Sequence, residues 1–216
     1  MAVTLQNTTE YDGDTNGTTH TFAHDSSGGG TNLAIVVGCG TYAGGFIDVS
    51  GITYDGDALT VAQESNNGDE GADLYYLVNP NTGAALNVVV TISQSGNIGA
   101  GAITASNVHQ TTPISDSDVS TTGSITLTTV SGELCVDCFE DWSATETVGA
   151  GQTQFVNVAS GDTNTAMSYE AATTTSTVMS WTGGSSPAHC ALSLKEVAGG
   201  GGGSTHHIHL PLLGVG

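Results

Sequence analysis

Carboxylate and amide side chains alternate near the start of the sequence, in a segment that could bind a calcium ion. The segment DGDTNG (12–17) places Asp12, Asp14 and Asn16 at every second position. Oxygen ligands at alternate positions can converge on a hard cation, as in the first half of a calcium-binding loop. The twelfth position of that loop is Ala23 rather than a bidentate glutamate, so a helix-loop-helix site is excluded. An ion-free, solvated turn uses the same residue types, and both interpretations stay open.

Histidines occur in two places where imidazole rings could meet a metal or another ligand. His20 and His24 lie on either side of Phe22, and all three would share one face of a strand; hydrogen bonding to neighbouring turns is the alternative. Near the C-terminus, His207 and His209 are separated by one residue. Three copies of such a pair around an axis could bind a transition metal, which requires an oligomer. No cofactor follows with certainty from these patterns, and calcium is the candidate.

Four cysteines, Cys39, Cys135, Cys138 and Cys190, lie in apolar or alternating stretches. The C-x-x-C spacing of CVDC (135–138) is typical of redox and zinc sites. In a strand, however, Cys135 and Cys138 would point to opposite faces, which makes a shared metal geometrically awkward. We therefore interpret the cysteines as small, buried hydrophobic residues.

Acidic residues are numerous, but no pair has the arrangement that catalysis needs. A glycosidase requires two carboxylates that face each other across a cleft. Glu140 and Asp141 are adjacent and would face opposite ways in a strand, while Glu133, Asp137 and Asp141 share a face at a spacing of four. Neither a serine-centred elbow nor a phosphate-binding glycine loop occurs. We expect that the protein is not an enzyme.

The charge balance excludes several kinds of partner. The chain has 21 acidic residues, one basic residue (Lys195) and a formal net charge of −20. Such a charge repels phosphate, so we expect neither nucleic acid nor an anionic membrane surface as a partner. No apolar run approaches the roughly 20 residues needed to span a bilayer. The first residues lack the basic and apolar regions of a secretory signal, so none is expected.

Short stretches of alternating apolar and polar residues follow one another along most of the chain. Glycine, asparagine and aspartate separate them, as in DGD, NNGDEG and NPNTG, and no segment has a sustained 3.6-residue repeat. Many short strands without helices predict an all-β fold, a two-layer antiparallel β-sandwich that is jelly-roll-like. We expect TNLAIVVG (31–38) and GELCVDCF (132–139) to be central strands, with residues 189–196 returning beside one of them.

The composition changes abruptly after Ala198. We interpret residues 1–198 as one β-sandwich domain, residues 199–205 as a glycine-rich linker and residues 206–216 as an extended C-terminal tail. Alternating apolar residues in the tail predict a strand that docks on the edge or groove of a neighbouring sheet. The expected docking residues are His206, His207, Ile208, His209, Leu210, Pro211, Leu212, Leu213 and Val215.

Several segments together resemble a widespread β-sandwich module of environmental bacteria and their phages. They include a Tyr-x-Leu-x-Asn-Pro turn (75–80) and a Gln-Thr-Thr-Pro segment (110–113) that follows a Gly-Ala strand. The resemblance extends over about residues 18–196 and implies a sandwich fold and a surface or virion protein. It implies no catalytic residue. The cysteines and the THHIHLPLLGVG end depart from the usual pattern of the module.

The expected function is that of a non-enzymatic phage virion structural protein, a head decoration, fibre or tail-associated subunit. We expect it to form homo-oligomers and to contact other virion proteins through the sandwich and the tail, with the virion as its location. One alternative is an extracellular carbohydrate-binding module that stacks glycans on Trp142, Trp181, Tyr75 or Tyr76. Another is a subunit of a filament at the cell surface.

Overall fold

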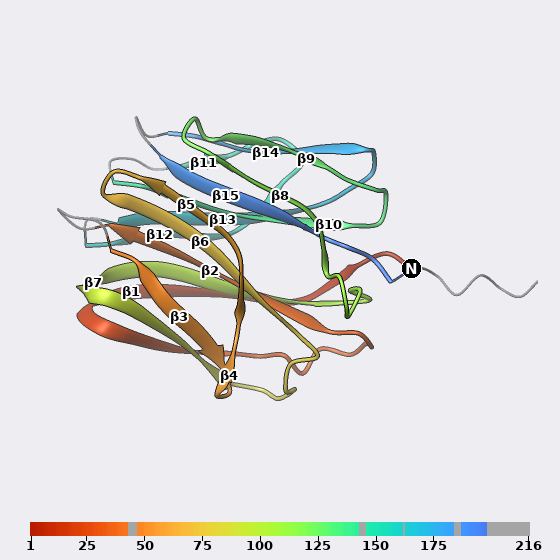
Figure 1. Cartoon of the computed structure of the whole chain (residues 1–216), viewed down its shortest axis with the longest axis horizontal. Helices are drawn as coiled ribbons and strands as arrows, with labels where there is room; N and C mark the ends of the chain where they lie inside the picture. The colour runs from red at the N-terminus through yellow and green to blue at the C-terminus, as the bar shows by residue number, and fades with distance from the viewer. Residues whose placement is uncertain (43–46, 143–145, 162, 184–186, 198–216) are drawn as a thin grey trace, which may run out of the picture.

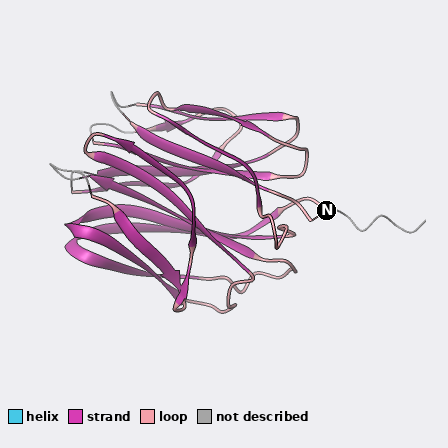
Figure 2. Ribbon diagram, in the orientation of Figure 1, coloured by secondary structure: helices cyan, strands magenta, loops and turns pink. Residues whose placement is uncertain are grey.

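The computed structural model describes residues 1–42, 47–142, 146–161, 163–183 and 187–197 (Figure 1). Within these ranges the chain forms fifteen strands and no helix, as the colouring of Figure 2 makes plain. All the paired strands among them run antiparallel. The all-β class and the antiparallel sandwich that the sequence predicts are therefore confirmed. The described ranges also hold no helix with the length and hydropathy to cross a membrane.

The first seven strands form one sheet. They are β1 (Thr4–His24), β2 (Ala34–Tyr42), β3 (Val49–Tyr54), β4 (Asp57–Ala58), β5 (Thr60–Asn67), β6 (Glu70–Val78) and β7 (Leu86–Ser106). Their order is β4-β3-β7-β2-β6-β5, and β1 pairs with β7 along the other edge of β7. β3 pairs with the first half of β7 and β2 pairs with its second half, so β7 connects the two parts of the sheet.

The two long strands of this sheet fold over on themselves. The register between the antiparallel strands β1 and β7 is irregular from Gly13 to Thr19, where the strand pair bends. Beyond the bend the chain returns over itself, since the ring of Tyr11 stacks on that of Phe22 with the centroids 4.8 Å apart. The space enclosed by the folded sheet is filled by buried side chains from β2, β3, β6 and β7, among them Val37 and Val90.

The remaining strands form two more sheets. The second contains β8 (Ile114–Ser120), β10 (Leu134–Asp141), β12 (Thr153–Ser160), β13 (Thr163–Ala171) and β15 (Ala188–Leu194), in the order β12-β13-β10-β15-β8. The third, smaller sheet contains β9 (Ser124–Thr128), β11 (Thr147–Val148) and β14 (Ser176–Thr182). Figure 1 shows these sheets as successive layers, so the sandwich has a third sheet that the sequence did not indicate.

The middle of the molecule is buried on both sides. Every residue of β10 and β15 is buried, and so is every residue of β2 except Tyr42. Strands covered on both faces carry nearly continuous apolar residues rather than an alternation, which is the pattern of β2. β10 and β15 also bury polar side chains, among them Asp137, Glu140 and His189. β2 and β10 are interior strands and β15 pairs with β10, so the expected placement of 31–38, 132–139 and 189–196 is confirmed.

Glycines let the first and second sheets approach closely. Side chains such as Val36 and Leu192 fill the core between these sheets. A Cβ atom at Gly38 would overlap the Met167 side chain, and one at Gly40 would overlap Thr165 and Glu140 of the facing sheet. The bare backbone of β2 is therefore part of the packing at this interface.

The two ends of the described chain lie side by side. The N-terminal amine of Met1 donates to the carbonyl of Val197 at 3.0 Å, and it forms an ion pair of 3.2 Å with Glu196. Residues 195–197 are partly exposed, so the chain leaves the sandwich at its surface. The predicted linker (199–205) and tail (206–216) lie outside the described residues.

Candidate functional site

The predicted docking and transition-metal residues belong to that undescribed part of the chain. The docking tail, His206 to Val215, and the His207 and His209 pair within it therefore stay predictions. What the structure does provide is the surface of the sandwich on which such a tail could dock, together with the other candidate residues of the sequence analysis.

The predicted calcium segment lies in β1, where the β1–β7 strand pair bends. Asp12 and Asn16 are exposed, and Asn16 accepts a hydrogen bond from Ser95 on the facing strand. Within the described ranges, no three histidine, cysteine or acidic side chains are placed to hold a metal ion. Calcium binding at Asp12, Asp14 and Asn16 stays a prediction.

The paired histidines of β1 are packing residues. His20, Phe22 and His24 are all buried and alternate with exposed residues, so they share one face as predicted. One ring nitrogen of His24 lies 2.8 Å from Thr9 Oγ1 and the other lies 2.8 Å from Thr104 Oγ1, so the imidazole joins the two halves of the folded sheet. Burial lowers the pKa of His24 to about 4, which keeps the ring neutral.

The four cysteines are buried, as the sequence predicts, and all four are free thiols. Cys138 lies in the core between the first and second sheets, whereas Cys135 lies in the core between the second and third. The two thiols of the C-x-x-C segment thus point to opposite faces of β10, and they do not form a shared metal site. Burial raises the pKa of all four thiols, so they stay protonated and unreactive.

A buried polar network that the sequence analysis did not predict surrounds Asp137. One carboxylate oxygen accepts hydrogen bonds from the backbone nitrogen and the hydroxyl of Ser168, at 2.8 and 2.7 Å. The other accepts from Trp181 Nε1 at 2.8 Å and lies 3.0 Å from His189 Nε2. All four side chains are at most 4% exposed, and together they join the second sheet to the third.

This network contains serine, histidine and aspartate, but in an order different from that of a nucleophilic triad. In such a triad the histidine lies between the other two residues and accepts the proton of the serine. Here Asp137 lies in the middle and Ser168 donates to it directly. The arrangement holds two sheets together. The sequence signal for this network is Asp137 itself, because an acidic residue among the apolar residues of β10 needs buried hydrogen-bond donors.

Carboxylates gather at the end of the sandwich where β2, β6 and β10 meet. Glu70, Glu140, Asp141 and Glu146 are buried at this end and act electrostatically on one another. At least seven of the 21 acidic side chains are buried in the described ranges; the other three are Asp73, Glu133 and Asp137. Glu140 accepts a hydrogen bond from Thr165 Oγ1 at 2.7 Å. One oxygen of Glu70 and one of Glu146 have no hydrogen-bond partner among the described residues.

Burial, reinforced by nearby negative charges, raises the pKa of four of these groups, Glu70, Asp73, Glu140 and Glu146. Burial, followed by the charge of Asp141, raises the pKa of Glu70 to about 7, and burial raises the pKa of Glu146 to about 7. Further along β6, burial and the charge of Glu64 raise the pKa of Asp73 to about 8. The pKa of Glu140 is also raised, chiefly by burial. Near neutral pH a substantial fraction of the Glu70 and Glu146 carboxyl groups is therefore protonated.

An exposed aromatic pair adjoins the same end. Trp142, which follows β10, is 52% exposed, and its ring stacks on Tyr42 with 6.5 Å between the centroids and 17° between the planes. Glu70 accepts a hydrogen bond from the backbone of Trp142. Trp181 and Tyr75 are instead buried and belong to the core. Of the two tryptophans, Trp142 alone is therefore available to stack on a ligand from solution.

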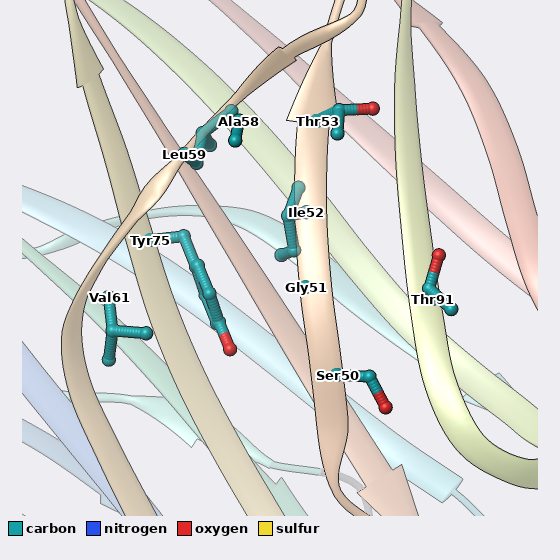
Figure 3. Close-up of a pocket in the computed structure, with 9 residues that line it drawn as sticks. All are labelled: Ser50, Gly51, Ile52, Thr53, Ala58, Leu59, Val61, Tyr75 and Thr91. Carbon is teal, nitrogen blue, oxygen red and sulfur yellow. The ribbon is translucent and has the colours of Figure 1, made fainter.

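An open groove of about 450 Å³ lies between β3 and the segment that joins β4 to β5 (Figure 3). Ile52, Leu59, Val61 and Tyr75 form its apolar lining, and Val61 is 44% exposed. The lining also includes the following smaller and polar residues: Ser50, Gly51, Thr53, Ala58 and Thr91.

Strand edges border the groove. Beside the groove β3 pairs with β4 through Thr53 and Tyr54, and its Ile52 carbonyl accepts a hydrogen bond from the Leu59 N–H at 2.9 Å. As far as the described residues show, β5 pairs with β6 alone. Tyr75 connects the two sides, since its hydroxyl donates to the carbonyl of Val49 at 3.0 Å and lies 3.4 Å from Glu64. A strand edge without a partner is a template for pairing with another extended segment.

The fold and this groove define an all-β sandwich protein with an apolar groove at the edge of its first sheet. Comparisons with protein-family models, with curated proteins and with solved structures found no similar protein. The proposals below therefore depend on the chemistry of the chain itself.

Proposed function

We propose that this protein is a non-enzymatic structural subunit of a phage virion, a head decoration, fibre or tail-associated protein. The observation that carries the proposal is the construction of the sandwich. It is held together by cores between its own sheets, and its last described residues lie at the surface. The residues that follow are a glycine linker and an apolar tail with no acidic group. On this proposal the body folds without its tail and offers it to a neighbour.

Two further features support this function. The resemblance to a sandwich module of bacteria and phages implies a surface or virion protein. Four free, buried thiols fit a protein that folds in a reducing cytoplasm, where virions assemble. The partners are further copies of the chain and other virion proteins, and the location is the virion.

Deletion of residues 199–216 is expected to leave the sandwich folded and to prevent its incorporation into particles. The expected signature is an unchanged Tm together with loss of the protein from purified virions, measured by quantitative mass spectrometry. A matched control replaces residues 206–216 with a glycine-serine segment of the same length. Normal incorporation of the truncated protein would contradict the docking role, and absence of the full-length protein from virions would overturn the function itself.

The exposure of Trp142 favours carbohydrate binding as a second candidate function. Sugar rings stack on exposed aromatic faces, and carboxylates such as Asp69, which is exposed beside Glu70, can accept hydrogen bonds from sugar hydroxyls. The buried Trp181 and Tyr75 take no part in this candidate.

On a glycan array, the full chain is expected to bind a subset of glycans if this second function holds. Trp142→Ala should abolish that binding, because the stacking face is lost, whereas Trp142→Phe should retain part of it. Equal binding by the alanine variant, or no binding by the full chain, would rule out the candidate.

A further inference from the structure

We propose that the groove between β3 and β5 receives residues 206–216 of a second copy of this chain as an added β-strand. The inference deepens the proposed function and rests on it, because it names the surface through which subunits would join. It is carried by the shape of the groove, the period of the tail and the charges of both.

The groove has the form that strand addition needs. β3 is paired along one edge with β7. On its other edge Thr53 and Tyr54 pair with β4 and the Ile52 carbonyl accepts from the Leu59 N–H, so among the described residues the part of this edge without a strand partner is Ser50 and Gly51. A Cβ atom at Gly51 would meet no atom within 4 Å, so the space above this part of β3 is open. In strand addition, main-chain hydrogen bonds to an edge provide affinity and pockets for alternate side chains provide specificity.

The tail has the matching period. In an extended segment Ile208, Leu210 and Leu212 lie on one face, because successive side chains alternate. That face would contact the groove at Val61, which is 44% exposed, above a floor formed by the largely buried side chains of Ile52, Leu59 and Tyr75. The N–H groups of successive residues point to opposite edges, so Pro211 removes a donor on one edge only. The strand can therefore pair fully through its other edge.

The charges of the two surfaces are compatible. The body is strongly acidic, and the carboxylates Glu64 and Asp48 adjoin Tyr75 at the groove. Residues 198–216 contain no acidic residue and three of the seven histidines. The acidic sandwich domains repel one another, but the tail carries no acidic side chain and can approach them. Protonation of the tail histidines below about pH 6.5 adds electrostatic attraction to the acidic domain.

The decisive experiment measures binding of a labelled peptide with the sequence of residues 204–216 to a protein truncated after Ala198. Fluorescence anisotropy should report saturable binding. Val61→Asp places a charge in the groove and should weaken binding at least 10-fold, while the matched control Val119→Asp, at a similarly exposed valine of β8, should leave it within twofold. Gly51→Val is a second groove variant; it fills open space without touching the core and should also weaken binding. Circular dichroism and Tm confirm that each variant is folded.

Experiments on the full-length chain distinguish a tail that binds the groove of a second copy from a tail that binds the groove of its own molecule. Sedimentation velocity should show concentration-dependent oligomers that Gly51→Val dissociates to monomers. A full-length monomer that no longer takes up the peptide would mean that the tail occupies its own groove, and would overturn the proposal. Absence of peptide binding, or equal binding by the groove variants, would also overturn it.

These outcomes are separable from those for the proposed function. If the tail is required for incorporation into virions but does not bind the groove, this inference fails and the proposed function stands. If the peptide binds the groove but the protein is absent from virions, the groove is a self-association site and the proposed function fails.

Discussion

Replacing Asp137 with alanine is expected to lower the free energy of unfolding by about 3–5 kcal/mol, because a buried charged partner is removed from groups that stay buried. The Ser168 hydroxyl, Trp181 Nε1 and His189 all lose their acceptor. In a chain of this size the loss corresponds to a decrease in Tm of about 10 °C. Thermal unfolding followed by circular dichroism measures it.

Two variants test the cause. Asp137→Asn preserves the shape but turns an NH₂ group toward some of the donors, so it should recover only part of the stability. Asp118→Ala removes an exposed carboxylate from β8 of the same sheet and should change stability by less than about 0.5 kcal/mol. A loss in Asp137→Ala no larger than that of Asp118→Ala would show that the network does not hold the sheets together.

The second large effect is a dependence of stability on pH. Glu70, Asp73 and Glu146 have folded-state pKa values raised to about 7, 8 and 7, against ordinary values of 4.5, 3.8 and 4.5. Between the two sets of values the folded protein binds more protons than the unfolded chain. Raising the pH from about 4.5 to 8 therefore favours unfolding, and the stability that the bound protons provide is lost over this window.

His24 acts in the opposite direction. Its pKa is lowered to about 4, against an ordinary value of 6.5, so the unfolded chain takes up a proton first as the pH falls below 6.5. Stability from His24 is thus lost toward pH 4. With three carboxyl groups against one imidazole, we expect the highest Tm at mildly acidic pH, with a decrease of several degrees by pH 8.5.

The double variant Glu70→Gln/Glu146→Gln tests this assignment. Glutamine resembles the protonated carboxyl group and does not titrate, so the variant should have a flatter profile of Tm against pH. It should be more stable than the natural protein at pH 8.5 by about 5 °C. The control Asp12→Asn changes an exposed carboxylate and should leave the shape of the profile unchanged. A steep profile in the double variant would locate the titrating groups elsewhere.

Sequence pattern was sufficient for the class of fold and for the central strands. The runs that contain Val36, Val136 and Leu192 lack alternation, and burial on both faces is the physical reason. The opposite orientations of Cys135 and Cys138 followed from strand geometry alone. The third sheet was not predictable, because β9 and β14 have the same alternation as any strand with one exposed face.

The sites were less accessible to such reasoning. The folding of β1 onto itself depends on contacts such as that of Tyr11 with Phe22, for which no local pattern exists. The burial of Glu70 and Glu146 depends on how loops and strands from distant parts of the chain come together, and no local sequence pattern encodes that arrangement. Asp137 could be suspected from its apolar neighbours, but its partners Ser168, Trp181 and His189 could not be chosen from the sequence.

The contact between Met1 and Val197 has a practical consequence for protein engineering. A purification tag or fluorescent protein fused ahead of Met1 would lie next to Val197, close to the start of the segment to which the proposed function assigns docking. The exposed turn at Asp69 sits elsewhere, between β5 and β6, and is the more suitable insertion point for a label in any assembly assay. Null results obtained with an N-terminal fusion would reflect the label rather than the native chain.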